Sequence, residues 1–326
     1  MQPKVYVTRR IPESGINLLQ QSCDVEIWDS DDVVPRDVFL EAVADKDGVL
    51  CLLTDKVDAE TLDVAKNAKI FANMAVGFDN IDVDECTKRG VMASNTPGVL
   101  TDTTADFAFT LLMAAARRIR EGHEFVHAGK WETWGPLLLM GQDIHHATLG
   151  LIGLGRIGTE MARRGQGFSM RVIYNDVVRR EDLEQELGLE YADFDTVLKE
   201  SDFVSLHVPY MPATHHLIST EQLALMKESA ILINTARGAI VDPQALYTAL
   251  KSGEIWAAGL DVTEPEPIPM DDPLLTLDNC LIAPHIASAS FNTRNDMSEL
   301  AANNILAALS GKRPPTILNP EVLEDS

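Results

Sequence analysis

Residues 147–158 have the sequence ATLGLIGLGRIG, a short apolar run followed by three glycines in the pattern G-x-G-x-x-G. The apolar run predicts a buried strand, and the residues after it, to about Arg164, predict a helix. Gly153 permits a tight turn, Gly155 lets the backbone approach a pyrophosphate, and Gly158 lets the helix pack closely on the strand. The stretch therefore predicts a dinucleotide-binding loop between a strand and a helix.

The residues around this loop bear on which dinucleotide it takes. Arg156 and Ile157 begin the predicted helix, so their backbone N–H groups would face the phosphates. Asp176 lies 18 residues beyond the last glycine, near the spacing at which an acid binds the ribose hydroxyls, although an acid that merely begins a turn is an alternative. Its carboxylate would repel a 2′-phosphate, which favours NAD(H), whereas Arg179 and Arg180 just beyond leave NADP(H) possible.

Apolar runs of strand length alternate with helical stretches on both sides of the loop, a pattern typical of parallel sheets covered on both faces. We therefore predict an α/β protein of two Rossmann-like or flavodoxin-like domains, with the cofactor domain inserted into the substrate domain. Residues 101–286 form the predicted NAD(P)-binding domain, and residues 1–100 with 287–326 form the substrate-binding domain. A continuous helical stretch over 102–129 opens the cofactor domain, and the last helix, about 289–309, returns to the first domain.

The composition excludes several classes of partner. The 326 residues include 27 basic and 50 acidic ones, for a formal charge of −23, which repels phosphates. We therefore expect no nucleic-acid partner and no binding to anionic membranes. No apolar run approaches the about 20 residues that cross a bilayer, and no apolar signal segment opens the chain, so we expect a cytoplasmic protein. Neither the four scattered cysteines nor the histidines show metal-ligand spacing, so we expect no metal site.

Polar and charged residues gather in three segments of the second half, each after an apolar run. They are NTARG at residues 234–238, GLDVTEPEP at 259–267 and APHIAS at 283–288. Because the carboxyl ends of parallel strands meet at the ligand crevice of an α/β sheet, we expect the segments to lie there. An imidazole titrates near neutral pH, and an arginine offers a planar fork of donors, so this set suits proton transfer to a small anionic substrate.

These segments, with GLGRIG, AVGFDN at residues 75–80 and NTPG at 95–98, resemble the D-isomer-specific 2-hydroxyacid dehydrogenase family over essentially the whole chain. Within the family, KWETWGPL at residues 130–137 and residues 261–275 are most similar to glyoxylate/hydroxypyruvate reductases. The resemblance implies an enzyme that reduces a small 2-keto acid to the D-2-hydroxy acid with NAD(P)H.

The resemblance assigns the family's catalytic arginine, glutamate and histidine to Arg237, Glu266 and His285. His285 would protonate the substrate oxygen, Glu266 would orient the ring and stabilise its charged form, and Arg237 would bind the carboxylate or carbonyl. Glu264 competes for the carboxylate role, but the family places its glutamate directly before the last proline of the motif, so the resemblance favours Glu266. Asp261 would accept a hydrogen bond from the nicotinamide amide, or would only cap the end of its strand.

The other assigned positions follow from the resemblance alone. The implied substrate contacts are Leu53, the backbone of Val76 and Gly77, Arg237 and Trp134. The implied cofactor contacts are Thr104, Gly153, Gly155, Arg156, Ile157, Gly158, Asp176, His207, Val208, Pro209, Thr214, Thr235, Ala236 and Asp261. Simpler alternatives are a capping role for Thr104 and an ordinary strand-to-loop junction for residues 207–214. In the reductases the Trp-rich segment crosses to a second subunit, so the resemblance implies a homodimer.

Other functions stay open on the same scaffold. Ala75 stands where phosphite dehydrogenases carry a lysine, which counts against phosphite, and the pairing of Glu266 with His285 counts against formate dehydrogenases. Other 2-hydroxy acids, such as D-lactate or D-glycerate derivatives, fit the sequence as well. A non-catalytic, NAD(H)-sensing corepressor is the alternative from another class, although the sequence supplies no basic face or interaction tail for it.

Overall fold

The computed structural model describes residues 2–324 and divides the chain into two compact units. Unit 1 contains residues 2–100 and 289–324, and unit 2 contains Thr101–Ser288. The chain therefore leaves unit 1 after Leu100, folds unit 2 as one continuous stretch, and returns to unit 1 at Ala289.

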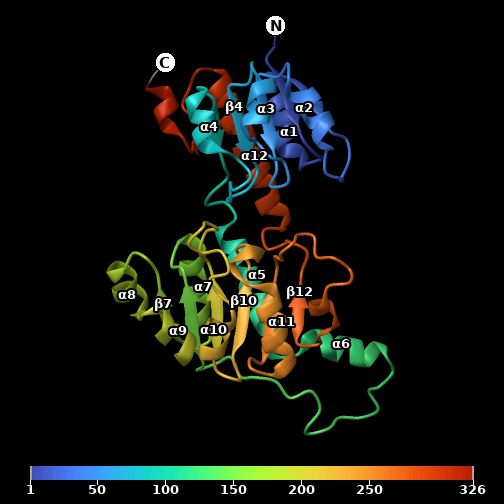
Figure 1. The fold of residues 1–326 in the computed structure, drawn as a ribbon, viewed down its shortest axis with the longest axis vertical. Helices are drawn as coiled ribbons and strands as arrows, with labels where there is room; N and C mark the ends of the chain where they lie inside the picture. Colours follow the sequence, from blue (N-terminus) through green and yellow to red (C-terminus); the bar gives the residue numbers. More distant parts are fainter. Residues whose placement is uncertain (1, 325–326) are drawn as a thin grey trace. The chain divides into compact units, whose positions relative to one another are not determined.

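Unit 1 is built on a five-stranded parallel sheet with the order β2-β1-β3-β4-β5, which is the flavodoxin-like order. Figure 1 labels strand β4 of this sheet and helices of the same unit around it. Its strands are β1 Lys4–Val7, β2 Asp24–Ile27, β3 Gly48–Cys51, β4 Ile70–Asn73 and β5 Met92–Ser94. Its helices are α1 Glu13–Gln20, α2 Arg36–Val43, α3 Ala59–Val64, α4 Val83–Lys88, α12 Phe291–Leu309 and the short 3-10 helix η3 Pro320–Leu323. Strands β3 and β4 are buried along their whole length, as parallel strands covered on both faces should be.

The last long helix, α12, packs closely on the first, α1, because Gly15 leaves room for it. A Cβ at Gly15 would lie 2.5 Å from the carbonyl oxygen of Ser298, and the Gly15 N–H donates to the Ser298 hydroxyl at 3.2 Å. A side chain at this position would therefore push the two helices apart. The contact ties the C-terminal residues of the chain to its first helix within unit 1.

Unit 2 is built on a seven-stranded parallel sheet with the order β12-β11-β10-β9-β6-β7-β8. Its strands are β6 Thr148–Ile152, β7 Arg171–Asn175, β8 Glu190–Tyr191, β9 Phe203–Leu206, β10 Ile231–Asn234, β11 Ala257–Leu260 and β12 Cys280–Ile282. The strand order reverses between β6 and β9, as in a Rossmann fold, and the ligand crevice of such a sheet lies outside the carboxyl ends of the strands there. The two parallel sheets confirm the predicted fold class.

The helices of unit 2 differ from the prediction in one place. They are α5 Thr101–Ala116, α6 Ile119–His127, α7 Arg156–Gly167, α8 Glu181–Leu187, α9 Phe194–Glu200, α10 Thr220–Leu225 and α11 Pro243–Ser252, with 3-10 helices η1 Gly238–Ile240 and η2 Pro273–Thr276. The continuous helix expected over residues 102–129 is wrong, because Arg118 adopts a left-handed conformation with φ 52° and separates α5 from α6. A Cβ at Gly141 would lie 2.1 Å from the Ala116 carbonyl, so a second chain segment occupies the space at the end of α5.

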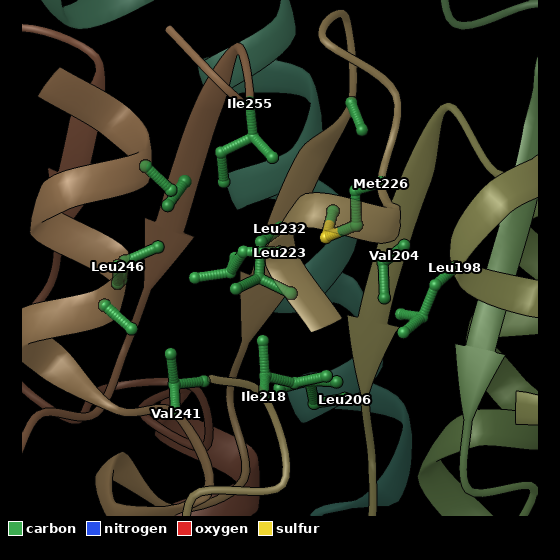
Figure 2. Close-up of a cluster of buried hydrophobic side chains, with 14 of the residues drawn as sticks. Leu198, Val204, Leu206, Ile218, Leu223, Met226, Leu232, Val241, Leu246 and Ile255 are labelled. Carbon is green, nitrogen blue, oxygen red and sulfur yellow. The ribbon is translucent and has the colours of Figure 1, made fainter. Parts of the chain in front are cut away.

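An apolar core holds the strands of unit 2 against their covering helices. Figure 2 shows Leu232 of β10 beside Leu223 of α10, with Met226 next to them. Val204 and Leu206 of β9 belong to the same cluster, and Leu206 lies beside Ile218. These side chains are at most 6% exposed, and burying each contributes about 1.5–3 kcal/mol. The core therefore fixes the strand ends from which the candidate site is built.

Candidate functional site

The glycine loop of unit 2 joins β6 to α7, and each of its glycines has a distinct steric role. Gly153 has φ 94°, which strains any residue with a Cβ, and a Cβ at Gly158 would lie 2.3 Å from the Gly153 carbonyl oxygen. A Cβ at Gly155 would meet nothing within 4 Å, so open space lies over the loop there. Gly155 also precedes α7 without a side-chain cap, and Arg156 and Ile157 supply the first N–H groups of the helix. This cradle fits the pyrophosphate of a dinucleotide.

Asp176 lies directly after β7 and holds its carboxylate against the glycine loop. Its Oδ2 accepts from the Leu154 N–H at 2.6 Å, and its Oδ1 accepts from the Val178 N–H at 3.2 Å. A carboxylate in this place can still accept bonds from ribose hydroxyls, because each oxygen has two lone pairs.

The two arginines beyond Asp176 are each held by a local carboxylate. Arg179 donates from Nε and Nη2 to Glu184 at 2.8 Å each, and Arg180 donates from Nε and Nη2 to Asp182 at 2.9 and 2.7 Å. The hydrogen bond from Arg179 is the main cause that lowers the pKa of Glu184. Both guanidinium groups are therefore engaged in ion pairs with local carboxylates.

His285 and Glu266 form a close pair in unit 2. Nδ1 of His285 and Oε1 of Glu266 lie 2.5 Å apart, and the side chains are 28% and 41% exposed. Burial opposes ionisation of Glu266, but the hydrogen bond with His285 and the charges of His285 and Arg237 outweigh it, so the pKa of Glu266 lies below its usual value. The ring nitrogen Nδ1 is thereby committed to the carboxylate, and Nε2 is the atom that could transfer a proton.

Asp261 fixes the loop that carries His285. Its two carboxylate oxygens accept from the N–H groups of Ile286 at 2.8 Å and Ala287 at 2.7 Å, and its carbonyl accepts from the His285 N–H at 2.9 Å. Desolvation raises the pKa of this buried acid against the effect of those bonds. His285 itself has φ 55°, a conformation that is rare without a glycine and is maintained where surrounding contacts enforce it.

Arg237 belongs to a turn that its neighbours shape. The Asn234 side chain accepts from the Ala236 N–H at 3.0 Å and donates to the Arg237 carbonyl at 2.8 Å. A Cβ at Gly238 would lie 1.9 Å from the Thr263 carbonyl oxygen, so this turn packs directly on the segment that carries Glu266. The structure thus brings the arginine turn and the Glu266 segment together.

Several of the sequence-predicted cofactor positions lie around the glycine loop. A Cβ at Gly153 would lie 2.8 Å from the His207 carbonyl, which places the start of the 207–214 segment against the loop. Burial lowers the pKa of His207 to about 4, and its Nε2 lies 2.9 Å from the Ser205 hydroxyl. Thr214 Oγ1 donates to the Pro209 carbonyl at 2.7 Å, which closes the segment, and Val208 lies between these residues.

The buried hydroxyl of Thr235 has no hydrogen-bond partner among residues 2–324. A polar group of a bound ligand could form a hydrogen bond with this hydroxyl, because buried polar groups generally have a partner. Thr104 is buried on α5, in contrast, and Trp134 is 78% exposed in the segment after α6. Among residues 2–324 of one chain, no contact joins Trp134 to the Glu266–His285 pair.

The predicted substrate positions of unit 1 lie in two loops that asparagines hold. The Asn95 side chain donates to the Val76 carbonyl at 2.7 Å, and the Asn73 side chain donates to the Gly77 carbonyl at 2.8 Å. Next to half-buried Leu53, the Leu52 N–H donates to the buried carboxylate of Asp55 at 2.7 Å. Sequence reasoning missed Asn73 and Asp55, and it gave no role to Asn80, Asn95 and Asn234 inside the motifs it quoted. It looked for ligand contacts and not for buried polar side chains that hold the backbone of a loop.

A Rossmann strand order, a glycine loop open at its second glycine, and an acid at the end of the second strand define a dinucleotide-binding protein. Residues 109–287 match the NAD-binding domain of the D-isomer specific 2-hydroxyacid dehydrogenases. Proteins named glyoxylate reductase from Korarchaeum cryptofilum and Thermococcus litoralis are 52% and 50% identical to the chain, over 99% and 100% of it and 98% and 99% of their own lengths. The chain belongs to the D-isomer specific 2-hydroxyacid dehydrogenase family.

Solved structures agree with this membership. A Thermus thermophilus protein is similar with a TM-score of 0.92 and 42% identity, covering 97% of this chain and 99% of that one. An NADPH-dependent glyoxylate/hydroxypyruvate reductase from Sinorhizobium meliloti, in complex with NADP and malonate, has a TM-score of 0.85 and 32% identity, covering 98% and 97%. Within residues 2–324, no helix combines the length and apolarity needed to span a bilayer.

Proposed function

We propose that this chain reduces glyoxylate and hydroxypyruvate, with a nicotinamide dinucleotide as reductant, and that hydroxypyruvate gives the D-2-hydroxy acid. The hydrogen-bonded Glu266–His285 pair is the observation that carries the proposal, because it presents an imidazole for proton transfer in the same unit as the glycine loop. Glyoxylate follows the name of full-length relatives that share about half of their residues with the chain. Hydroxypyruvate follows the name of a solved glyoxylate/hydroxypyruvate reductase that is 32% identical.

The chain's own residues would divide the chemistry as follows. A bound reduced dinucleotide supplies the hydride. His285 donates a proton from Nε2 to the oxygen of the reacting carbonyl, while Glu266 holds Nδ1 and stabilises the ring's positive charge. Arg237 binds the substrate carboxylate or carbonyl through its guanidinium group, and this fixed cation offsets the negative charge of the protein around an anionic substrate.

The remaining assignments belong to the same proposal. Unit 2 binds the dinucleotide at the glycine loop, at Thr104, at residues 207–214, at 235–236 and at Asp261, which would take the nicotinamide amide. Unit 1 binds the substrate carboxylate through the backbone of Val76 and Gly77, with Leu53 beside it. Trp134 acts in a homodimer, where its 78% exposed ring is covered by the second subunit. The protein works in the cytoplasm.

NAD(H) is the preferred cofactor in this proposal. Asp176 offers a carboxylate where a 2′-phosphate would stand, and like charges repel there. Arg179 and Arg180, the cations that could favour the phosphate, are held by Glu184 and Asp182. The neighbouring Sinorhizobium meliloti reductase is NADPH-dependent, so the preference in this chain rests on its own residues.

The direct test is a turnover assay of the purified chain with glyoxylate and hydroxypyruvate, each with NADH and with NADPH. We expect oxidation of the dinucleotide with both keto acids and a higher kcat/KM for NADH. No turnover with either keto acid would refute the substrate assignment. Tight NADH binding without turnover of either keto acid would favour a different 2-keto acid first and the non-catalytic, NAD(H)-sensing role second.

A further inference from the structure

A second cluster of histidine and carboxylate side chains lies in unit 2, apart from the Glu266–His285 pair. It consists of His215, His216 and Glu264, and one potential ligand atom from each lies within 4.8 Å of the other two. His215 and His216 are adjacent in the chain, but Glu264 is 48 residues from His216, so the spacing along the sequence does not reveal the cluster. The expectation of no metal site was based on that spacing.

Two members of the cluster are held in place by the fold. Nε2 of His216 and Oε2 of Glu264 lie 2.7 Å apart, and their side chains are 34% and 36% exposed. The His216 N–H donates to the Ala239 carbonyl at 2.8 Å, and two residues later Ile218 forms a bridge with Val241. His216 also has φ 48°, so its backbone is held in a left-handed conformation. These contacts hold one imidazole and one carboxylate next to each other, and a bound ion would replace their hydrogen bond and move Nε2 and Oε2 slightly apart.

The third member is placed to complete the set. The ring of His215 stacks on that of His216 with centroids 4.0 Å apart and an angle of 21° between the planes, and it meets the edge of Tyr210 at 6.0 Å. Zn²⁺ binds nitrogen and oxygen at about 2.0–2.2 Å, so two atoms that bind the same ion lie about 3.3 Å apart. The three potential ligand atoms of the cluster lie up to 4.8 Å from one another, so His215 must come closer to bind. His215 is exposed, so its ring can turn off the stack and bring a nitrogen to the ion.

We propose that His215, His216 and Glu264 bind a divalent first-row transition metal ion of the Zn²⁺ class. Two imidazoles and one carboxylate form a nitrogen-rich set that favours Zn²⁺ over Mg²⁺ or Ca²⁺, which take oxygen ligands. The net charge of −23 raises the local concentration of cations around the protein. The bound ion would join the segment after β9 to the segment that carries Glu266.

The consequence of such a site is a stronger link between two segments that otherwise share the hydrogen bond of His216 with Glu264. Glu264 lies two residues before Glu266, and His215 follows Thr214, which closes the 209–214 loop onto Pro209. An ion that binds the folded chain and not the unfolded one raises the melting temperature, and the rise grows with the logarithm of the free ion concentration above Kd. This gives a readout that does not depend on turnover, so the proposal can be tested even if the assigned substrates are wrong.

A second pair of histidines must be removed before the test. His123 and His127 are four residues apart on α6 with ring centroids 4.2 Å apart, and such a pair can chelate a metal by itself. The full chain carrying His123→Gln and His127→Gln, stripped with a chelator, is therefore the reference protein. Zn²⁺ binding is measured by calorimetry, and Co²⁺ absorption reports the ligand set.

In this reference protein we expect one Zn²⁺ per chain. Adding His215→Gln or Glu264→Gln should weaken Zn²⁺ binding by about 100-fold or more, since losing even an outer contact of a metal ligand costs about 10- to 100-fold. His145→Gln, which removes another exposed histidine, is the matched control and should change nothing. Both test variants lie on the surface, and circular dichroism without metal checks their folding. Zn²⁺ affinity that is absent from the reference, or equal in the test variants and the control, would overturn the proposal and leave a plain His216–Glu264 hydrogen bond.

Discussion

Replacing Glu266 with glutamine tests the centre of the proposed mechanism. The amide keeps the size and one oxygen acceptor for His285 Nδ1 but removes the negative charge that lies 2.5 Å from the ring. A hydrogen bond between charged groups contributes about 1.5–3 kcal/mol, and the 28% and 41% exposure of the two side chains places this one near the lower end, at about 1.5–2 kcal/mol. Since about 1.4 kcal/mol is a factor of ten, kcat/KM for keto acid reduction should fall about 10- to 30-fold at neutral pH.

The same charge sets the pH dependence of the reaction. The negative charge of Glu266 stabilises a positive charge on the ring beside it, so removing it should move the alkaline limb of the kcat/KM profile to lower pH. The profile is measured with saturating dinucleotide, for the wild type and for Glu266→Gln side by side.

Asp271→Asn is the matched control, because it removes an exposed carboxylate from the same segment. It should leave both kcat/KM and the profile unchanged. If Glu266→Gln kept its activity while Glu264→Gln lost it and moved the profile, the carboxylate would have been assigned to the wrong glutamate. An unchanged profile in Glu266→Gln despite a lower rate would reduce its role to packing.

Three further predictions follow from the same geometry. Arg237→Ala should lower kcat/KM by about 100-fold or more with an unchanged circular dichroism spectrum. Arg237→Lys should restore only part of the loss, because lysine lacks the planar fork of donors. Near-full activity in either variant would contradict substrate binding by this residue. Gly158→Ala should lower the melting temperature by several degrees, since its Cβ would lie 2.3 Å from a carbonyl oxygen. Gly155→Ala should leave the melting temperature unchanged and raise KM for the dinucleotide. Equal melting temperatures of the two variants would contradict the steric argument. Glu184→Gln frees Arg179 from its ion pair, so the ratio of kcat/KM for NADPH to that for NADH should rise, and parallel changes for both cofactors would contradict the argument.

The α/β class could be predicted because the sequence carries its signals locally. Near-continuous apolar runs mark parallel strands, and the glycine loop marks where the first strand of unit 2 gives way to a helix. The break at Arg118 could not be predicted, because the apolar period continues through it and only the second segment packed at Ala116 ends the helix there. Strand β8 was missed for the opposite reason, since Glu190–Tyr191 is two residues long and exposed, with no apolar run to mark it.

The candidate site could be predicted in its residue types and only in part in its contacts. Glu264 and Glu266 are chemically equal in the sequence, and their separation by one proline gives no physical reason to prefer either. The structure gives them different partners, because Glu266 meets His285 and Glu264 meets His216. Which partner each takes depends on how the segment after β11 runs past two loops that are distant in the chain, and no local pattern contains that information.

Asp261 shows why the supporting residues of a site are harder to predict than its reactive ones. In the sequence it is an acid at the end of an apolar strand, which is equally consistent with a cap and with a ligand contact. In the structure its carboxylate accepts two backbone N–H groups of the loop after β12 and holds His285 at φ 55°, where an unsupported histidine would relax to another conformation. Burying that carboxylate raises its pKa and so opposes its ionisation, a cost that the two hydrogen bonds offset. The position of the proton-donating imidazole therefore depends on a residue that need not touch the substrate, and the requirement for an acid there appears only once the two strands are seen side by side.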